Sequence, residues 1–384
     1  MKKQLSRFTL VILLIVMLCP LVLLTGCKSD KKYGVTQKGV RYRLYEEEIS
    51  EREYSTWSML APEIVLRKGD ACYMKYWYVS GLSKGFLDSC APVTSPVVKA
   101  EIKGTPVAAV NCDLGRESWE TITLPDSIRF ITGKLTGTAN VPSGLLYLGY
   151  GAARNVTNLE LENGLYYWGN WQVDYSSSRI TNTVEVREGT VGICSIPRFK
   201  SPDNGASVIL PDSVRYIGES CFGGLDGYYP ALDLSSVEYV GKEAFSNVFL
   251  GESRGPFIAS VTFSERLKYL GDHAFYGSHV AELDLSEAGD CIFGEEVFRG
   301  AENLTSICLP DGVTEVPVGM FEDSAVSYVT LPRTLKKIGT RAFYGCNLDT
   351  ISYAGTEEEW RAVEKEKGWY SLTGGKRVTV RYGE

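Results

Sequence analysis

Histidine is nearly absent from this 384-residue chain, which has only His273 and His279. No cysteine and no pair of carboxylates lies near them at a spacing typical of metal ligands. They are therefore interpreted as two surface histidines, and no metal site or cofactor is predicted. With so few histidines, Ser-His-Asp or Cys-His catalysis has little support. Carboxylate pairs are too frequent to exclude a glycosidase, but we expect a protein that is not an enzyme.

Runs of lysine and arginine are also lacking. The chain has 40 basic and 47 acidic residues and a formal net charge of −7. Nucleic acid is therefore not an expected partner, and charge alone would not hold the chain on anionic lipid. No glycine-rich phosphate-binding loop follows a predicted strand.

The ten cysteines contain no C-x-x-C pair. Cys194 and Cys221 are placed like small buried apolar residues. A disulfide between Cys72 and Cys90 is one possibility that the sequence leaves open.

No apolar run reaches the length of a comfortable membrane-spanning helix. Residues 10–24 form the longest run, of 15 residues, and follow the basic residues Lys2, Lys3 and Arg7. This order is typical of a secretory signal peptide, which is removed from the mature protein.

The apolar run ends in Leu-Thr-Gly-Cys, and this tetrapeptide resembles the bacterial lipobox. The resemblance implies that residues 1–26 are a signal peptide and that Cys27 carries a diacyl anchor. Residues 27–32 would be a short polar tether, and the rest of the chain would face outward at the bacterial cell surface. An ordinary secretory signal with a coincidental Cys27 is the alternative.

What the chain does have is a repeated segment of about 23 residues, best seen at residues 326–343 (VSYVTLPRTLKKIGTRAF). Val329 and Leu331 lie on one face of a short predicted strand, which ends at Pro332. Further apolar residues follow, and then Gly339, which is expected to permit a tight turn. The segment closes with an Ala-Phe pair. One such unit cannot bury its apolar face without a copy on each side.

Copies of this segment precede it without interruption. They occupy residues 208–222, 232–245, 261–275, 283–298 and 307–321. The closing phenylalanines of the six segments are Phe222, Phe245, Phe275, Phe298, Phe321 and Phe343. Successive steps are 23, 30, 23, 23 and 22 residues, and a turn-rich insertion at 251–256 accounts for the long step. Weaker copies are expected at 184–199, which ends in Phe199, and at 122–131. A regular period of this length predicts a repeat solenoid.

The segments resemble the BspA-like, or treponemal-type, leucine-rich repeats through the pattern L-x-x-I-x-L-P-x-x-V-x-x-I-G-x-x-A-F. The resemblance covers roughly residues 97–355 and implies short parallel β-strands on a concave face, with irregular or short helical turns on the other. It also implies a surface-exposed bacterial protein that binds other molecules, often called an adhesin. The repeat specifies the fold far better than the ligand.

The flanking segments are predicted to cover the ends of the array. Residues 33–96 are expected to be a small β-rich N-terminal cap, and residues 356–384 a helix followed by a strand. The repeats are degenerate at 132–183, where residues 141–148 could be a worn copy. Six residues from Tyr166 to Trp171 there hold four aromatic rings. Trp168 and Trp171 are either packed against neighbouring coils or exposed as a platform for a sugar or protein.

The remaining candidate surface is the outward face of the strands, and most of its residues are small and hydroxylic. Its predicted members are Thr121, Thr123, Ser260, Thr262, Glu282, Asp284, Ser306, Cys308, Tyr328, Thr330, Thr350 and Ser352. Threonine suits an exposed strand on propensity alone. The functional alternative is a shallow polar groove that binds an extended protein or glycan.

Three functions remain open at this point. The favoured one is a lipid-anchored, non-catalytic surface protein that recognises an extracellular protein or glycan. The others are a structural or assembly component of the cell envelope, and an envelope enzyme whose site lies outside the regular repeats.

Overall fold

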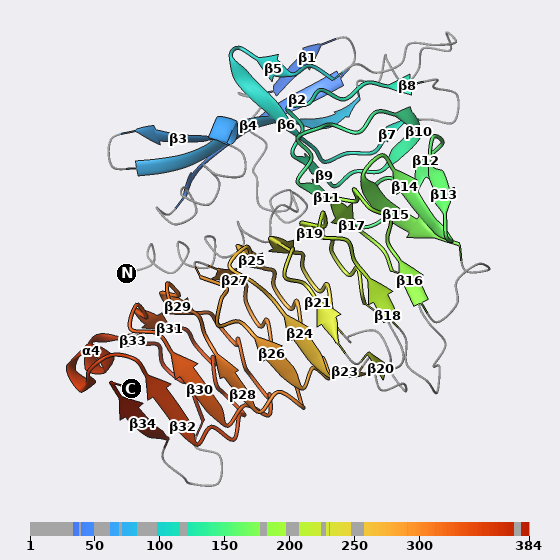
Figure 1. The fold of residues 1–384 in the computed structure, drawn as a ribbon. Coiled ribbons are helices and arrows are strands. Elements are labelled where there is room, and N and C mark those ends of the chain that lie inside the picture. The colour runs from blue at the N-terminus through green and yellow to red at the C-terminus, as the bar shows by residue number, and fades with distance from the viewer. Residues whose placement is uncertain are drawn as a thin grey trace. The chain divides into compact units, whose positions relative to one another are not determined.

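The computed structural model describes residues 34–37, 40–49, 62–68, 71–82, 98–115, 121–176, 183–196, 207–223, 228–229, 231–246, 257–289, 291–371 and 378–383. The predicted signal peptide and tether, with Cys27, lie outside these residues. The chain divides into two compact units (Figure 1). The first comprises residues 1–161 and 166–174, and the second comprises 162–165 and 175–384.

The first unit begins with antiparallel strands. β2 (Val40–Ile49) pairs with β1 (Gly34–Gln37) and with β4 (Ala71–Leu82), and β4 also pairs with β3 (Val65–Lys68). A 3-10 turn, η2 (Pro62–Ile64), precedes β3. The described part of residues 33–96 is thus β-rich, as predicted.

These strands continue directly into the first coils. β4 pairs in parallel with β6 (Thr105–Val110), β6 with β9 (Phe130–Ile131), and β9 with β11 (Tyr147–Leu148). β11 is therefore paired in parallel with its neighbour, as a coil strand would be, and the worn repeat at 141–148 stays a prediction. The other strands of this part are β5 (Glu101–Ile102), β7 (Leu114–Gly115), β8 (Thr121–Ile122), β10 (Leu135–Ala139) and β12 (Asn155–Val156). β13 (Glu160–Glu162), β14 (Leu165–Trp168) and β15 (Trp171–Tyr175) follow, with β14 and β15 side by side as a hairpin.

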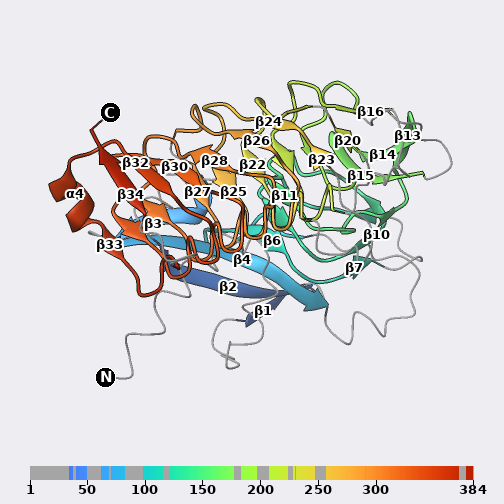
Figure 2. The same ribbon diagram turned by 90° about the horizontal axis from the view of Figure 1, so that it is seen from below.

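In the second unit each coil contributes one strand to a first ladder, the one that the sequence predicts. Its strands are β16 (Thr183–Glu185), β18 (Ser207–Ile209), β21 (Leu232–Asp233), β24 (Ser260–Thr262), β26 (Glu282–Asp284), β28 (Ser306–Cys308), β30 (Tyr328–Leu331), β32 (Thr350–Tyr353) and β34 (Thr379–Tyr382). Every pairing within this ladder is parallel. Figure 2 shows the strands from β24 onward lying one after another along the unit. The repeat fold is confirmed.

A second ladder of two-residue strands runs along another side of the coils and was not predicted. It consists of β17 (Gly192–Ile193), β19 (Tyr216–Ile217), β22 (Tyr239–Val240), β25 (Tyr269–Leu270), β27 (Ile292–Phe293), β29 (Glu315–Val316), β31 (Lys337–Ile338) and β33 (Glu364–Lys365). In the described coils the remaining chain forms turns. A separate parallel pair, β20 (Tyr228–Tyr229) with β23 (Phe257–Ile258), flanks the insertion.

The closing phenylalanines form one continuous stack through the core. Each of the six is at most 2% exposed, and neighbouring ring centroids lie 4.6–5.6 Å apart. Offset stacking of this kind adds to the free energy of apolar burial. The stack confirms the predicted register of the repeats, and Phe199 lies outside the described residues.

The glycine before the closing turn has a different role from the one expected. Gly339 is not in the left-handed region, so it is not required for a tight turn. A Cβ at Gly339 would lie 2.8 Å from the Val318 nitrogen, and one at Gly271 would lie 2.7 Å from the Gly241 carbonyl carbon. Glycine is needed because the backbones of adjacent coils approach closely at this slot.

The closing turn forms a third line of contacts, which we call the turn edge. Its first residue has a positive φ of 51–60° in every coil, at Ser220, Glu243, His273, Glu296, Gly319 and Arg341. The N–H of each donates to a carbonyl of the next coil at 3.0–3.1 Å, and so does the N–H of each closing phenylalanine at 2.7–2.9 Å. The left-handed residue turns the backbone so that both donors point along the array.

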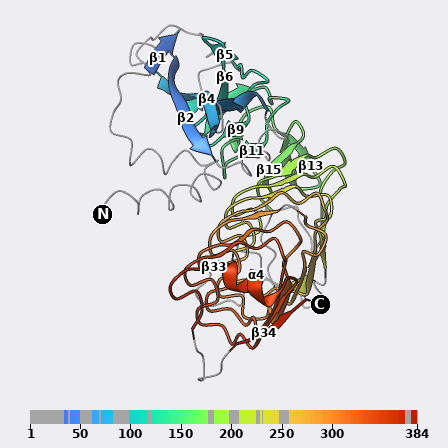
Figure 3. The same ribbon diagram turned by 90° about the vertical axis from the view of Figure 1, so that its left-hand side faces the viewer.

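The C-terminal segment contains a short helix and a final strand. α4 (Glu357–Ala362) begins at a capping box in which Thr356 and Glu359 exchange hydrogen bonds. Its buried Trp360 packs against Tyr353 and Trp369, with centroids 5.3 and 6.4 Å apart. Figure 3 shows α4 beside β33 and β34 at the end of this unit. Among the described residues, no helix has the length and apolar character needed to cross a membrane.

Candidate ligand-binding surface

The first ladder turns a row of polar residues outward, because strand residues alternate between its two faces. Thr121 and Thr123 belong to the first unit and not to this ladder, and they are exposed on either side of the buried Ile122. In the second unit Ser260 pairs with Glu282, and Thr262 pairs with Asp284. Ser260 is half-buried and the other three are exposed.

Further along, the paired strands β28, β30 and β32 carry two parallel rows of outward-facing residues. Ser306 pairs with Tyr328 and Tyr328 with Thr350, while Cys308 pairs with Thr330 and Thr330 with Ser352. Tyr328 is 40% exposed, which is unusual for so large a side chain. Within the second unit, the predicted members from Ser306 to Ser352 are therefore in register on neighbouring strands, and their role in binding stays a prediction.

Thr350 is a correction to the predicted surface. It is only 8% exposed, and its hydroxyl lies 3.3 Å from the Asp349 carboxylate. Thr350 pairs with Tyr328 on one side and with Thr379 of β34 on the other. The bulky Tyr328 and the final strand flank it, so a ligand on this face would not reach it.

The outward face carries its negative charge at the β21–β26 end. Asp233 and Asp284 flank Thr262 in register, and each accepts a hydrogen bond of 2.9 Å from a serine N–H two residues later. The bond from Ser286 lowers the pKa of Asp284, so this carboxylate is held ionised. From β28 onward the face is mainly hydroxylic, with Tyr328 as its large aromatic residue.

Trp168 and Trp171 form no exposed platform, and that interpretation of the aromatic cluster is wrong. Trp168 is 0% exposed and Trp171 is 1% exposed. The Trp168 Nε1–H donates to the Ala139 carbonyl at 2.8 Å, which satisfies its polar group inside the first unit. These side chains pack in the core and are removed from the candidate surface.

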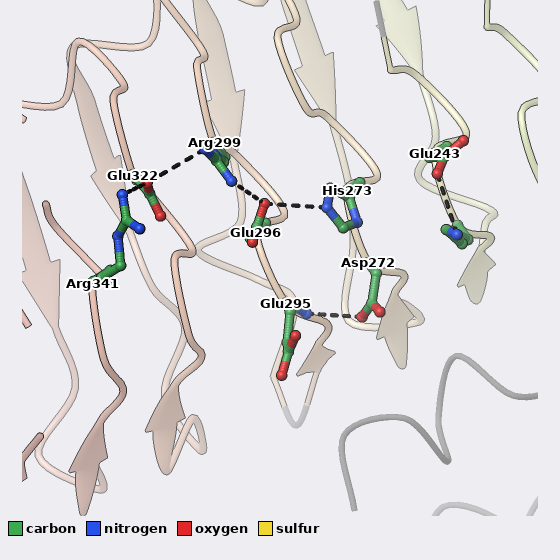
Figure 4. A network of polar contacts seen from close by, with 9 residues as sticks. Glu243, Asp272, His273, Glu295, Glu296, Arg299, Glu322 and Arg341 are labelled. Atoms are coloured by element: carbon green, nitrogen blue, oxygen red, sulfur yellow. Dashed lines mark hydrogen bonds and ion pairs between the residues drawn. The ribbon is translucent and has the colours of Figure 1, made fainter. Parts of the chain in front are cut away.

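A network of charged side chains lies along the turn edge, and the sequence interpretation missed it (Figure 4). Glu296 Oε2 lies 3.2 Å from His273 Nε2 and 2.8 Å from an Arg299 nitrogen. Arg299 also reaches Glu322 at 3.4 Å, and Arg341 pairs with the same carboxylate. Each of these contacts except the Glu296–Arg299 pair joins adjacent coils. The available indication was that Arg299 and Glu322 directly follow the closing phenylalanines of two successive repeats.

Burial dominates the electrostatics of two carboxyl groups in this region. The Glu322 side chain is almost fully buried, and this raises its pKa even though two arginines act in the opposite direction. Burial raises the pKa of Asp272 to about 7, although the carboxyl group accepts a 2.8 Å hydrogen bond from the Glu295 N–H. Proton binding to Asp272 is therefore coupled to folding near neutral pH.

The repeat sequence matches the model of a known family over the part of the chain that builds these coils. Six copies of the "BspA type Leucine rich repeat region" match within residues 196–254 and 234–349. Residues 196–349 belong to this family. The family resemblance of the repeats is thereby confirmed, and no curated protein matches the chain.

Several solved bacterial structures are similar to this chain. A leucine-rich cell surface protein of Faecalibacterium prausnitzii is 16% identical, covering 89% of this chain and 100% of that one, with a TM-score of 0.27. A leucine-rich repeat protein of Bacteroides ovatus is 16% identical over 83% and 90% of the two chains, with a TM-score of 0.30. The pneumococcal vaccine antigen PcpA is 14% identical over 85% and 83%, with a TM-score of 0.28. The family assignment rests on the repeat sequence and not on these superpositions.

The cysteines of the BspA-type region serve mainly as core residues. Cys194 and Cys221 are each 2% exposed, as predicted, and burial raises the pKa of both thiols. Cys346 is also buried, whereas Cys308 is exposed on the outward face. Cys90 and the Cys72 side chain lie outside the described residues, so their pairing stays open.

Proposed function

We propose that the protein is a non-catalytic surface protein that recognises an extracellular protein or glycan on the outward face of the first ladder. The observation that carries this proposal is Tyr328, a 40%-exposed ring in register with the exposed Ser306 of the neighbouring strand. A large exposed aromatic residue among small hydroxylic ones offers apolar contact area with hydrogen-bonding groups beside it.

Two further features support the assignment. BspA-type repeats occupy the larger part of the second unit, and stacked repeats commonly use an extended face for binding. The lipobox-like sequence ending in Cys27 fits a diacyl anchor, which would hold the chain at the bacterial surface facing outward.

The test is binding of the chain from residue 28 onward to arrays of glycans and extracellular-matrix proteins. A specific, saturable interaction should weaken when Tyr328 is changed to Ala. Tyr344→Ala is the matched control, because Tyr344 is 43% exposed but lies on the turn edge. Both variants should keep the parent's thermal unfolding midpoint.

Equal loss of binding in the two variants would place the ligand elsewhere. No binding on either array would contradict recognition of these ligands. Cross-linking in intact cells would then test the envelope-assembly function.

A further inference from the structure

Both strand ladders of the second unit are interrupted at the same place. In the first ladder β21, β24 and β26 form one sheet, and β28 to β34 form another. In the second ladder the sheet that ends at β27 is separate from the sheet of β29, β31 and β33. The first ladder is also interrupted between β18 and β21, but there the second ladder is continuous. Among the described coils, only the junction between β26–β27 and β28–β29 lacks pairing in both ladders.

Pro317 supplies a physical reason for the break in the second ladder. It occupies the slot that holds Gly294 in the preceding coil and Gly339 in the following one. In the other regular coils the N–H of this slot donates to the preceding coil at 2.7–2.9 Å. Proline has no N–H to donate, so this bond is lost.

The proline ring also conflicts with the spacing of the coils. A Cβ at Gly294 would lie 2.3 Å from Asp272 Oδ1, and one at Gly339 would lie 2.8 Å from the Val318 nitrogen. Pro317 carries a Cβ and a ring, so the same close approach would drive them into the backbone at Gly294 and Glu295. The proline therefore removes a bond and disfavours the close approach of the backbones that glycine permits at this slot.

The turn edge, in contrast, is continuous across this junction. The N–H groups of Glu296, Phe298 and Gly300 donate to Val318, Met320 and Glu322 at 2.8–3.0 Å. Phe298 stacks on Phe321, and Arg299 bridges Glu296 and Glu322. One of three sides is thus joined by hydrogen bonds, while the other two lack strand pairing.

We infer that this junction is a joint that divides the array into two blocks, one ending at residue 300 and one beginning at residue 306. The blocks bend about the turn edge as an axis, because hydrogen bonds join the coils there and strand pairing is lacking in both ladders. The outward face is divided at the same place. Glu282 and Asp284 lie on one block, and Ser306, Tyr328 and Thr330 lie on the other.

The experiment measures distance distributions between two spin labels by pulsed electron resonance on the full chain. The labels are carried by introduced ketone amino acids, so that the native cysteines remain. One pair spans the joint at Glu265 and Arg333, and the reference pair lies within one block at Asp212 and Ser286. All four residues are exposed and occupy the same turn, and each pair is three coils apart.

The distribution across the joint should be broader than the distribution within the block. Pro317→Gly restores the N–H and removes the Cβ. This substitution should narrow the distance distribution of the pair across the joint to the width of the reference pair. Pro310→Ala, in the same coil but outside both ladders, should leave it broad.

Equal widths in the parent protein would overturn the joint, and this comparison stands even if Pro317→Gly does not fold. A distribution that stays broad in a folded Pro317→Gly would overturn the role given to the proline. Hydrogen exchange of residues 306–316, slower in Pro317→Gly than in the parent, is the second measurement.

Discussion

Phe298 stacks on Phe321 with ring centroids 5.6 Å apart and an interplanar angle of 10°. The two rings belong to coils whose strands are not paired with each other. At this junction the stack and the turn-edge hydrogen bonds hold the coils together. The free energy of unfolding should therefore be sensitive to either ring.

Phe298→Ala should lower the free energy of unfolding by about 3–5 kcal/mol, as for a buried aromatic side chain. Phe298 is 1% exposed and contacts a ring on each side, so the substitution leaves a cavity in the middle of the stack. Chemical denaturation measures the change. Tyr344→Ala, at an exposed site, should cost less than about 1 kcal/mol. An unchanged denaturation midpoint for Phe298→Ala would contradict the register of the repeats.

The positive φ of the first turn-edge residue predicts opposite effects on stability when glycine is introduced at this position and when glycine is replaced there. Ser220 has a φ of 51°, so Ser220→Gly should stabilise the protein by about 0.5–1 kcal/mol through relief of backbone strain. Gly319 has a φ of 60°, so Gly319→Ala should destabilise it by about 1 kcal/mol or more. The added Cβ would also lie 2.9 Å from Glu296 Cγ. Thermal unfolding of both variants tests this prediction. Midpoints that shift in the same direction in the two variants would contradict it.

Asp272 predicts a pH dependence of stability. Its pKa is about 7 in the folded protein against an ordinary value of 3.8, so between these values the folded state binds more protons than the unfolded state. The free energy of unfolding should therefore fall as the pH rises through this window. Asp272→Asn should remove that fall and, at pH 8, should exceed the parent's stability by about 2 kcal/mol after allowance for partial solvation.

Denaturation curves at pH 4 and pH 8 provide the measurement. Near pH 4 the Asp272 carboxyl group is protonated in the folded protein, so the variant and the parent should be close. The Asn side-chain oxygen can still accept from the Glu295 N–H, which makes the variant a fair isostere. A constant difference between the two proteins at both pH values would contradict the prediction.

Cys27→Ala should release the protein from the membrane. The proposed diacyl group on Cys27 would supply two chains, which is enough for stable attachment. Fractionation of cells that express each form, followed by immunoblotting, measures the distribution. Membrane association that persists in Cys27→Ala would count against lipidation. Cys19→Ala is a control within the same segment and should leave the distribution unchanged.

The sequence was sufficient to predict the parallel strands of the first ladder and the burial of the closing phenylalanines. Both depend on a local pattern that recurs at a regular interval along the chain. The second ladder was missed because two-residue strands such as β25 are too short to alternate visibly. They form because adjacent coils approach closely at Gly271 and its equivalents. This approach depends on how two coils pack, and the sequence of one coil does not show it.

The outward face was only partly predictable for a similar reason. Alternation along a strand assigns Thr350 to the outward face, but its burial depends on Tyr328 and β34 on either side. Trp168 and Trp171 occur in a polar-looking hairpin, and only the tertiary structure shows that Trp168 bonds to Ala139. Side-chain exposure is set by neighbours that are distant in the sequence.

The left-handed slot also determines how the surface of this protein can vary. Its backbone donates the same hydrogen bond whether the residue is Ser, Glu, His, Gly or Arg, and its side chain is not part of the phenylalanine core. One such position recurs in every coil, at an interval set by the roughly 5 Å separation of paired strands. The charges of the side chains at this position can therefore change from coil to coil while the fold of the coils stays the same.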